Sequence, residues 1–61
     1  MAKLILLGDT RLKKNIVLNA DQIEYAYRKD LPKGDVTEIR MMNGELHHVE
    51  ETPDQILGLS M

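Results

Sequence analysis

The sequence predicts a small, mainly β fold, either an antiparallel sheet of about five short strands or a partly open SH3-like barrel, with a short C-terminal helix. Three observations support this fold class. Short runs of strand-forming residues cover most of the chain, tight-turn signals separate them, and a helical pattern follows only after Thr52. The alternative is an open α+β sheet with the last helix packed across one face, in which the first and last strands need not pair.

The length of the chain limits what it can contain. Its 61 residues are enough for one domain, over residues 1–61, and a chain of this size buries only about 60% of the surface that its unfolded form exposes. It has no cysteine for disulfides and no Cys/His cluster with zinc spacing. We therefore expect binding to a partner protein, or self-association, to supply additional stability.

The composition is typical of a soluble protein. Apolar residues make up 43% of the chain and charged residues 30%, and the net charge of −2 favours neither nucleic acid nor an acidic surface strongly. The apolar run from Leu4 to Leu7 is too short for a signal-peptide core or a membrane span. We therefore expect a cytoplasmic protein that does not bind membranes.

The first part of the chain is predicted to form two strands. Lys3–Leu7 is an apolar run without helical period, which favours a strand that is buried on both faces or paired at the centre of a small sheet. Gly8–Lys14 is polar and basic and begins with a turn signal, so we expect a surface loop there. Asn15–Leu18 is predicted to be a second short strand, with Ile16 and Leu18 on one face.

A capped turn and a third strand are predicted next. Asn19–Gln22 carries two residues that can cap a helical turn and so reverse the chain. Ile23–Arg28 alternates as a half-buried strand does. One face would carry Ile23, Tyr25 and Tyr27, and the other Glu24, Ala26 and Arg28. Lys29–Asp35 contains proline, glycine and two aspartates and is predicted to be a turn region.

The Asn43-Gly44 pair between Val36–Met42 and Glu45–Glu50 is a strong hairpin signal. A two-residue loop would place Val49 on the opposite face from Ile39. We favour a three-residue loop with the glycine as a left-handed bulge residue, because it gathers the β-branched and apolar side chains on one core surface. That surface would comprise Thr37, Ile39, Met41, His47 and Val49.

The end of the chain has the pattern of a short helix. Thr52 can cap a helix over Pro53–Leu59, whose first turn contains the negative charge of Asp54. So short a helix is not stable alone, so we expect it to dock on the sheet. Its apolar face would comprise Ile56, Leu57 and Leu59, while Gly58 would limit how far it extends.

No catalytic, cofactor or metal site is predicted. His47 and His48 are adjacent, and neighbouring strand residues point to opposite faces, so the two imidazoles cannot bind one ion together. The same argument separates Glu50 from Glu51, and no His, Ser or Lys partner is predictable beside them. Because so small a chain cannot enclose a deep pocket, we expect a nonenzymatic protein.

Nucleic-acid binding is the alternative function. Two predicted loops are basic, and two tyrosines could stack on bases if their face were open. The candidate contacts are Arg11, Lys13, Lys14, Arg28 and Lys33. The acidic net charge, and the alternation of Tyr25 and Tyr27 in phase with Ile23, favour loops in solvent and packed tyrosines instead.

Three apolar residues near the hairpin tip are candidates for protein contact: Met41, Met42 and Leu46. Flexible thioether side chains suit adaptable protein surfaces. The same residues are equally compatible with a place in the core.

The segments Val17–Glu24, Thr37–Val49 and Glu51–Ile56 resemble the small FlbD-like proteins, which include bacterial flagellar and swarming-motility accessory proteins and short bacterial and phage chains. The shared elements are an Asn-x-Asp turn before a strand, a strand–Asn-Gly–strand hairpin and a Glu-(Ser/Thr)-Pro-like helix cap. In this chain the connections at Gly8–Lys14 and Asp30–Asp35 are longer. The resemblance implies a nonenzymatic accessory or regulatory protein. We therefore expect a bacterial or phage interaction module that acts as an oligomer, the alternative being a nucleic-acid-binding small barrel in regulation.

Overall fold

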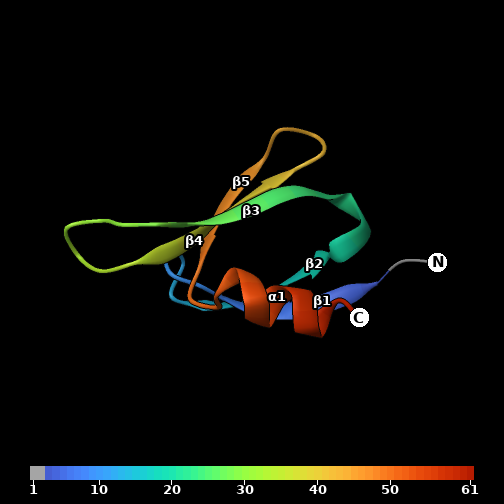
Figure 1. The fold of residues 1–61 in the computed structure, drawn as a ribbon, viewed down its shortest axis with the longest axis horizontal. Helices are drawn as coiled ribbons and strands as arrows, with labels where there is room; N and C mark the ends of the chain where they lie inside the picture. Colours follow the sequence, from blue (N-terminus) through green and yellow to red (C-terminus); the bar gives the residue numbers. More distant parts are fainter. Residues whose placement is uncertain (1–2) are drawn as a thin grey trace.

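Five strands and two helical segments make up residues 3–61, the part of the chain that the computed structural model describes (Figure 1). They are β1 (Leu4–Asp9), β2 (Lys14–Asn19), the 3-10 turn η1 (Ala20–Gln22), β3 (Ile23–Lys29), β4 (Val36–Met41), β5 (Leu46–Val49) and α1 (Pro53–Leu59). The strands form one open antiparallel sheet in the order β2-β1-β5-β4-β3. The predicted mainly β fold with a C-terminal helix is confirmed.

The first and last strands pair, but only briefly. Asp9 of β1 lies opposite Val49 of β5, and the N–H of Glu50 donates to the carbonyl of Gly8 over 2.9 Å. This contact joins the β1–β2 hairpin to the three-stranded unit formed by β3, β4 and β5. Because β2 and β3 remain at the two outer edges, the sheet does not close into a barrel.

The β4–β5 hairpin has the register that we favoured from sequence. Ile39 lies opposite His47 and Thr37 opposite Val49, so the loop has three residues. Gly44 has a φ of +92°, the left-handed conformation expected of the bulge residue.

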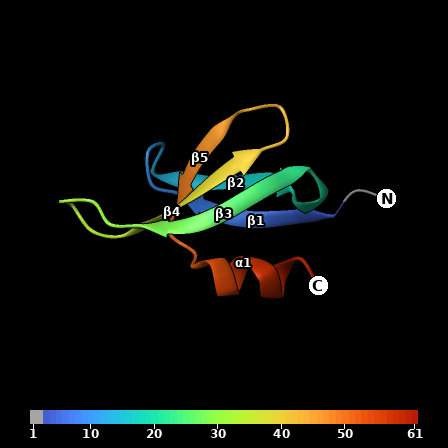
Figure 2. The same cartoon turned by 45° about the horizontal axis from the view of Figure 1, so that its top comes forward.

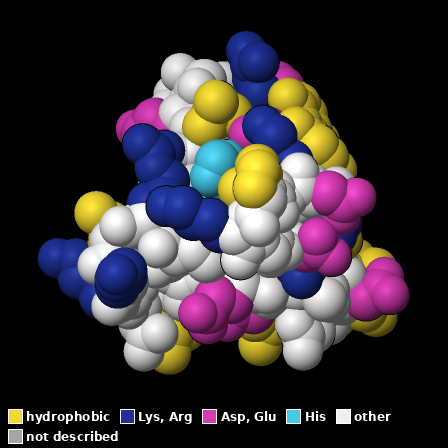
Figure 3. Space-filling view, turned by 90° about the vertical axis from the view of Figure 1, so that its left-hand side faces the viewer, with side chains coloured by type: hydrophobic (Ala, Val, Ile, Leu, Met, Phe, Trp, Pro, Cys, Tyr) yellow, Lys and Arg dark blue, Asp and Glu magenta, His cyan; other side chains and the backbone are white. Residues whose placement is uncertain are grey.

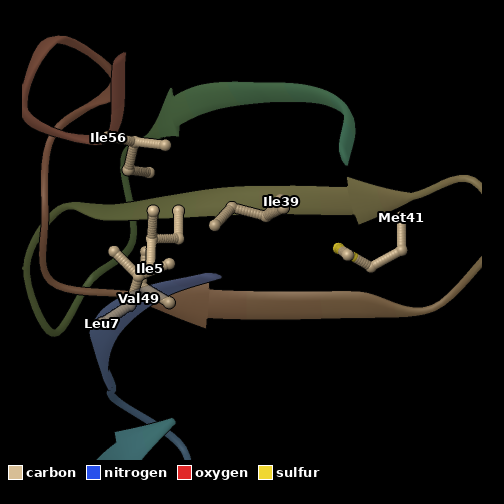
Figure 4. Close-up of a cluster of buried hydrophobic side chains, with 6 residues drawn as sticks. All are labelled: Ile5, Leu7, Ile39, Met41, Val49 and Ile56. Carbon is tan, nitrogen blue, oxygen red and sulfur yellow. The ribbon is translucent and has the colours of Figure 1, made fainter. Parts of the chain in front are cut away.

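The core lies between the two parts of the sheet and the helix. Figure 2 shows α1 running alongside β1 and β3 on one side of the sheet. The buried side chains come from both parts and from α1 (Figure 4): Ile5, Leu7, Ile39, Met41, Val49 and Ile56. Ile16 and Leu18 of β2 pack against this cluster from one face, as predicted.

Helix α1 begins as predicted. Thr52 accepts a hydrogen bond from the backbone N–H of Gln55 over 3.2 Å, and the Gln55 side chain accepts from the Thr52 N–H over 2.8 Å, which completes a capping box. Ile56 is buried, but Leu57 and Leu59 are 61% and 49% exposed, so the predicted three-residue apolar face is wrong for both. Leu57 lies about 100° around the helix from Ile56 and therefore faces sideways, whereas Leu59 is the last residue of this two-turn helix.

The first connection is shorter than predicted. The strands continue through Asp9 and resume at Lys14, so the loop comprises only residues 10–13 instead of Gly8–Lys14. Gly8 lies within β1, where a Cβ atom would come 3.2 Å from the carboxylate of Glu50. The lack of a side chain at Gly8 therefore lets the segment after β5 approach β1 closely. The sequence pattern could not distinguish this role from that of a turn residue.

Within residues 3–61, no helix is long and apolar enough to span a membrane.

Candidate functional site

A groove of about 640 Å³ separates the β1–β2 turn from the β3–β4 loop. Figure 3 faces this end of the molecule and shows lysine and arginine side chains gathered around a histidine. The lining residues are Thr10, Arg11 and Lys13 from the turn, Leu31, Lys33, Gly34 and Asp35 from the loop, and Val36, His48 and Glu50. The groove is open to solvent.

The β1–β2 turn is fixed by Asp9. Its carboxylate is buried and accepts the backbone N–H groups of Arg11 and Leu12, each over 2.8 Å. Lys13 adopts a φ of 56°, a left-handed conformation that lets the chain return along β1. These local constraints hold Arg11 and Lys13 at the rim of the groove.

Four of the five predicted nucleic-acid contacts lie together at this end. Arg11, Lys13 and Lys33 line the groove, and Lys14 lines a neighbouring hollow that also includes Lys13. Asp35 also lines the groove, so its walls carry both signs of charge.

Arg28 does not itself line the groove. Its guanidinium donates to Thr37 Oγ1 over 3.1 Å and to the Glu50 carbonyl over 3.4 Å. Arg28 pairs with Thr37 across the strands, so the two side chains share the face of the sheet that covers the core. Arg28 thus contacts Glu50, which lines the groove, and its role as a nucleic-acid contact stays a prediction.

A cluster centred on Glu38 adjoins the groove. Glu38 is 8% exposed and accepts a hydrogen bond from the Tyr27 hydroxyl over 2.6 Å; its other oxygen lies 3.0 Å from His48 Nε2 and 3.5 Å from Lys29 Nζ. Tyr27 and His48 are its cross-strand neighbours. The Tyr27 hydrogen bond and then the His48 contact lower the pKa of Glu38 to about 2, while the same carboxylate raises the pKa of Tyr27.

The two histidines lie on opposite faces, as predicted. His47 lies across from Ile39 on the core face, with its Nε2 3.6 Å from Glu45, whereas His48 faces Glu38. Within residues 3–61, no three side chains of the metal-binding types are placed to hold one ion.

The prediction that Tyr25 and Tyr27 are packed core residues is wrong. A β-bulge between Ile23 and Tyr25 shifts the alternation of β3 by one residue. Ala26 therefore packs against the core, while Tyr25 and Tyr27 are 42% and 41% exposed on the other face, with ring centroids 6.0 Å apart. The tyrosine face is therefore open, as base stacking would require.

The three candidate protein contacts at the hairpin tip separate in the structure. Met41 is 8% exposed and belongs to the core, because it follows Ile39 on the inner face of β4. Met42 and Leu46 are 58% and 46% exposed. Only these two remain available as surface contacts.

A larger apolar surface lies on the β1–β2 hairpin. Leu4, Leu6 and Val17 are 67%, 57% and 57% exposed, and we call them the β1–β2 outer face. Leu6 lies directly opposite Val17, and Leu4 follows on the same side of β1. Of the two alternatives predicted for the first strand, burial on both faces is wrong, whereas its pairing inside the sheet agrees with its position between β2 and β5. Sequence analysis missed this surface, although the alternation of Asn15, Val17 and Asn19 with apolar residues indicated an outward face.

No family model, curated protein or solved structure matches the chain. Three features of the structure bear on its function: the groove, the Glu38 cluster and the β1–β2 outer face.

Proposed function

We propose that the chain is a nonenzymatic interaction module of bacterial or phage type that acts in the cytoplasm by binding a protein through the β1–β2 outer face. The observation that carries the proposal is the exposure of Leu4, Leu6 and Val17, each more than half exposed and all on one side of a two-stranded unit. Single exposed apolar residues are common, but contiguous ones mark interaction surfaces. The resemblance to FlbD-like accessory proteins supports the same class of function.

The Glu38 cluster supports a nonenzymatic role. General acid or base catalysis is most efficient when the pKa of the group lies near the working pH. The donors around Glu38 hold its pKa at about 2, far below neutrality. Both carboxylate oxygens also contact neighbouring side chains. We therefore interpret the cluster as a cross-strand tie that orders the outer side of the sheet.

Site-specific photo-crosslinking tests the proposal. A photoreactive amino acid at position 6 or 17, introduced in cells that naturally produce the chain, should give one discrete adduct, identified by mass spectrometry. The matched control is position 57, an equally exposed leucine on α1. The same weak adducts from all three positions would contradict the proposal, whereas a specific adduct from 6 and 17 alone would support it.

Nucleic-acid binding is a second candidate function, favoured by one observation. The fold brings Arg11, Lys13 and Lys33 to one groove and leaves Tyr25 and Tyr27 exposed on the sheet. Basic grooves with stacking aromatics bind single strands. The acidic net charge and the carboxylates of the groove oppose phosphate binding.

Fluorescence anisotropy with short DNA and RNA, single- and double-stranded, decides between these functions. We expect no submicromolar binding at physiological salt. Submicromolar binding that weakens steeply with salt, and that Lys33→Glu abolishes while Lys3→Glu preserves, would favour the nucleic-acid function instead. Lys3→Glu is the matched control because it makes the same charge change at the start of β1, the end opposite the groove.

A further inference from the structure

We propose that β2 pairs with β2 of a second copy of this chain, antiparallel and about a two-fold axis at Val17. The proposal rests on the proposed function, because pairing of the two β2 edges places two copies of the β1–β2 outer face side by side in the surface that binds the partner protein.

The two edges of the sheet differ in how they are protected. Natural edge strands discourage pairing with other chains through charged residues and bulges. The β3 edge has both, with a bulge beside Glu24 and the charged residues Arg28 and Lys29. The β2 edge has a single charge, Lys14 at its first residue, and runs through Asn15–Asn19 without another. Of the two outermost strands, β2 is therefore the one that lacks the features that prevent addition of a strand.

The backbone of β2 also presents free groups in the right places. The N–H of Ala20 donates to the carbonyl of Lys3 over 2.7 Å, in the register of the β1–β2 pair. In an antiparallel pair the direction of the backbone groups alternates along the strand. Ile16 and Leu18 therefore turn their amide and carbonyl groups toward β1. The residues that turn theirs toward the open edge are Asn15, Val17 and Asn19.

The sequence of β2 fits its own copy in one register. With the axis at Val17, Val17 faces Val17, Asn15 faces Asn19 and Ile16 faces Leu18, so like chemistry meets like at each pair. With the axis at Ile16 or at Leu18, an asparagine of one copy would instead lie opposite Val17 of the other. Directly opposed residues share a face, so the β1–β2 outer faces of the two copies would join into one apolar surface.

The ends of the paired strands are complementary in charge. In the Val17 register, Lys14 of one copy lies opposite Ala20 of the other, and the next residue of that copy is Asp21, in the first turn of η1. Each end of the interface therefore brings a lysine toward an aspartate, and the two-fold axis makes this happen twice. No like charges meet along the paired residues.

Charge-swap variants at Val17 test the pairing by sedimentation velocity and equilibrium. Val17→Glu and Val17→Lys should each raise the dimer dissociation constant at least tenfold, because two like charges would meet on the axis. An equimolar mixture of the two should recover a dimer, since only a residue that faces itself can be rescued in this way. Met42→Glu, which alters an equally exposed apolar residue at the hairpin tip, should leave the dimer intact.

A single cysteine gives a second measurement, because the chain has none of its own. Opposed residues of a hydrogen-bonded antiparallel pair have Cα atoms about 5.5 Å apart, within disulfide range. Val17→Cys should therefore form a covalent dimer on mild oxidation much faster than Met42→Cys.

Several results would overturn the pairing. The first is an unmodified chain that stays monomeric at high micromolar concentration. The second is a dimer that Val17→Glu does not weaken, although circular dichroism shows the variant to be folded. The third is an equimolar mixture of Val17→Glu and Val17→Lys that does not recover a dimer. A monomeric chain that still crosslinks from position 17 to a different protein would remove the dimer and leave the proposed function in place.

Discussion

Replacing Ile39 by alanine should lower the free energy of unfolding by about 2–5 kcal/mol, the usual cost of removing a large aliphatic side chain from a packed core. Ile39 is 0% exposed and sits on β4 between β3 and β5, so its neighbours cannot easily collapse into the space left behind. A domain of this size rarely has more than a few kcal/mol of stability. We therefore expect the variant to be largely unfolded at 37 °C, as measured by circular dichroism during urea and thermal denaturation.

Leu46→Ala is the control for this prediction. Leu46 lies on the neighbouring strand and is 46% exposed, so its truncation removes less buried surface and leaves no enclosed cavity. Its urea midpoint should stay close to that of the unmodified chain. Equal losses for the two variants would mean that Ile39 does not occupy the centre of the core.

Local signals in the sequence correctly predicted the β4–β5 hairpin loop and the caps of η1 and α1. The Asn43-Gly44 pair specifies its hairpin loop through the conformation of glycine, and Thr52 specifies the start of α1 through the N–H groups that it caps. Asn19 caps η1 in the same way, accepting the N–H of Asp21 over 3.0 Å. Each of these features depends on residues within four positions of one another, so the sequence contains the necessary information.

The orientation of the tyrosines could not be predicted from local pattern. The alternation of Ile23, Tyr25 and Tyr27 is regular, and nothing in it reveals the bulge after Ile23. The bulge depends on how β3 fits the twisted edge of β4, which is a tertiary property. One inserted residue exchanged the two faces of the strand.

The candidate surfaces depend on contacts between distant segments. Arg11 and Lys33 meet across the groove only because β1 joins β5 at its last residues. Leu4 and Leu6 are exposed because the helix covers only the inner side of β1. The apolar run Leu4–Leu7 does not reveal whether one face of the strand or both faces are covered. Burial in a two-layer domain is decided by the position of the second layer, which composition does not give.

The loss of folding stability in acid should come largely from Glu38. Its folded pKa of about 2 lies below the ordinary 4.5, so ionised Glu38 binds protons less readily in the folded state than in the unfolded state. The stability that it contributes is therefore complete above pH 4.5 and is lost as the pH falls toward 2. Glu38→Gln should be less stable than the unmodified chain at neutral pH, and the difference in urea midpoint should close over this window.

Asp30 is the other shifted carboxyl, and it acts in the opposite direction. The hydrogen bond and negative charge of Asp35 raise its pKa, so protonation on acidification favours the folded state. The variant Asp30→Asn should therefore still lose stability between pH 4.5 and 2, because Glu38 is present. The double variant Asp30→Asn/Glu38→Gln should not show this loss. If Glu38→Gln kept the full pH dependence between 4.5 and 2, the hydrogen bonds from Tyr27 and His48 would not be holding the carboxylate ionised, and the cross-strand tie would have to be rejected.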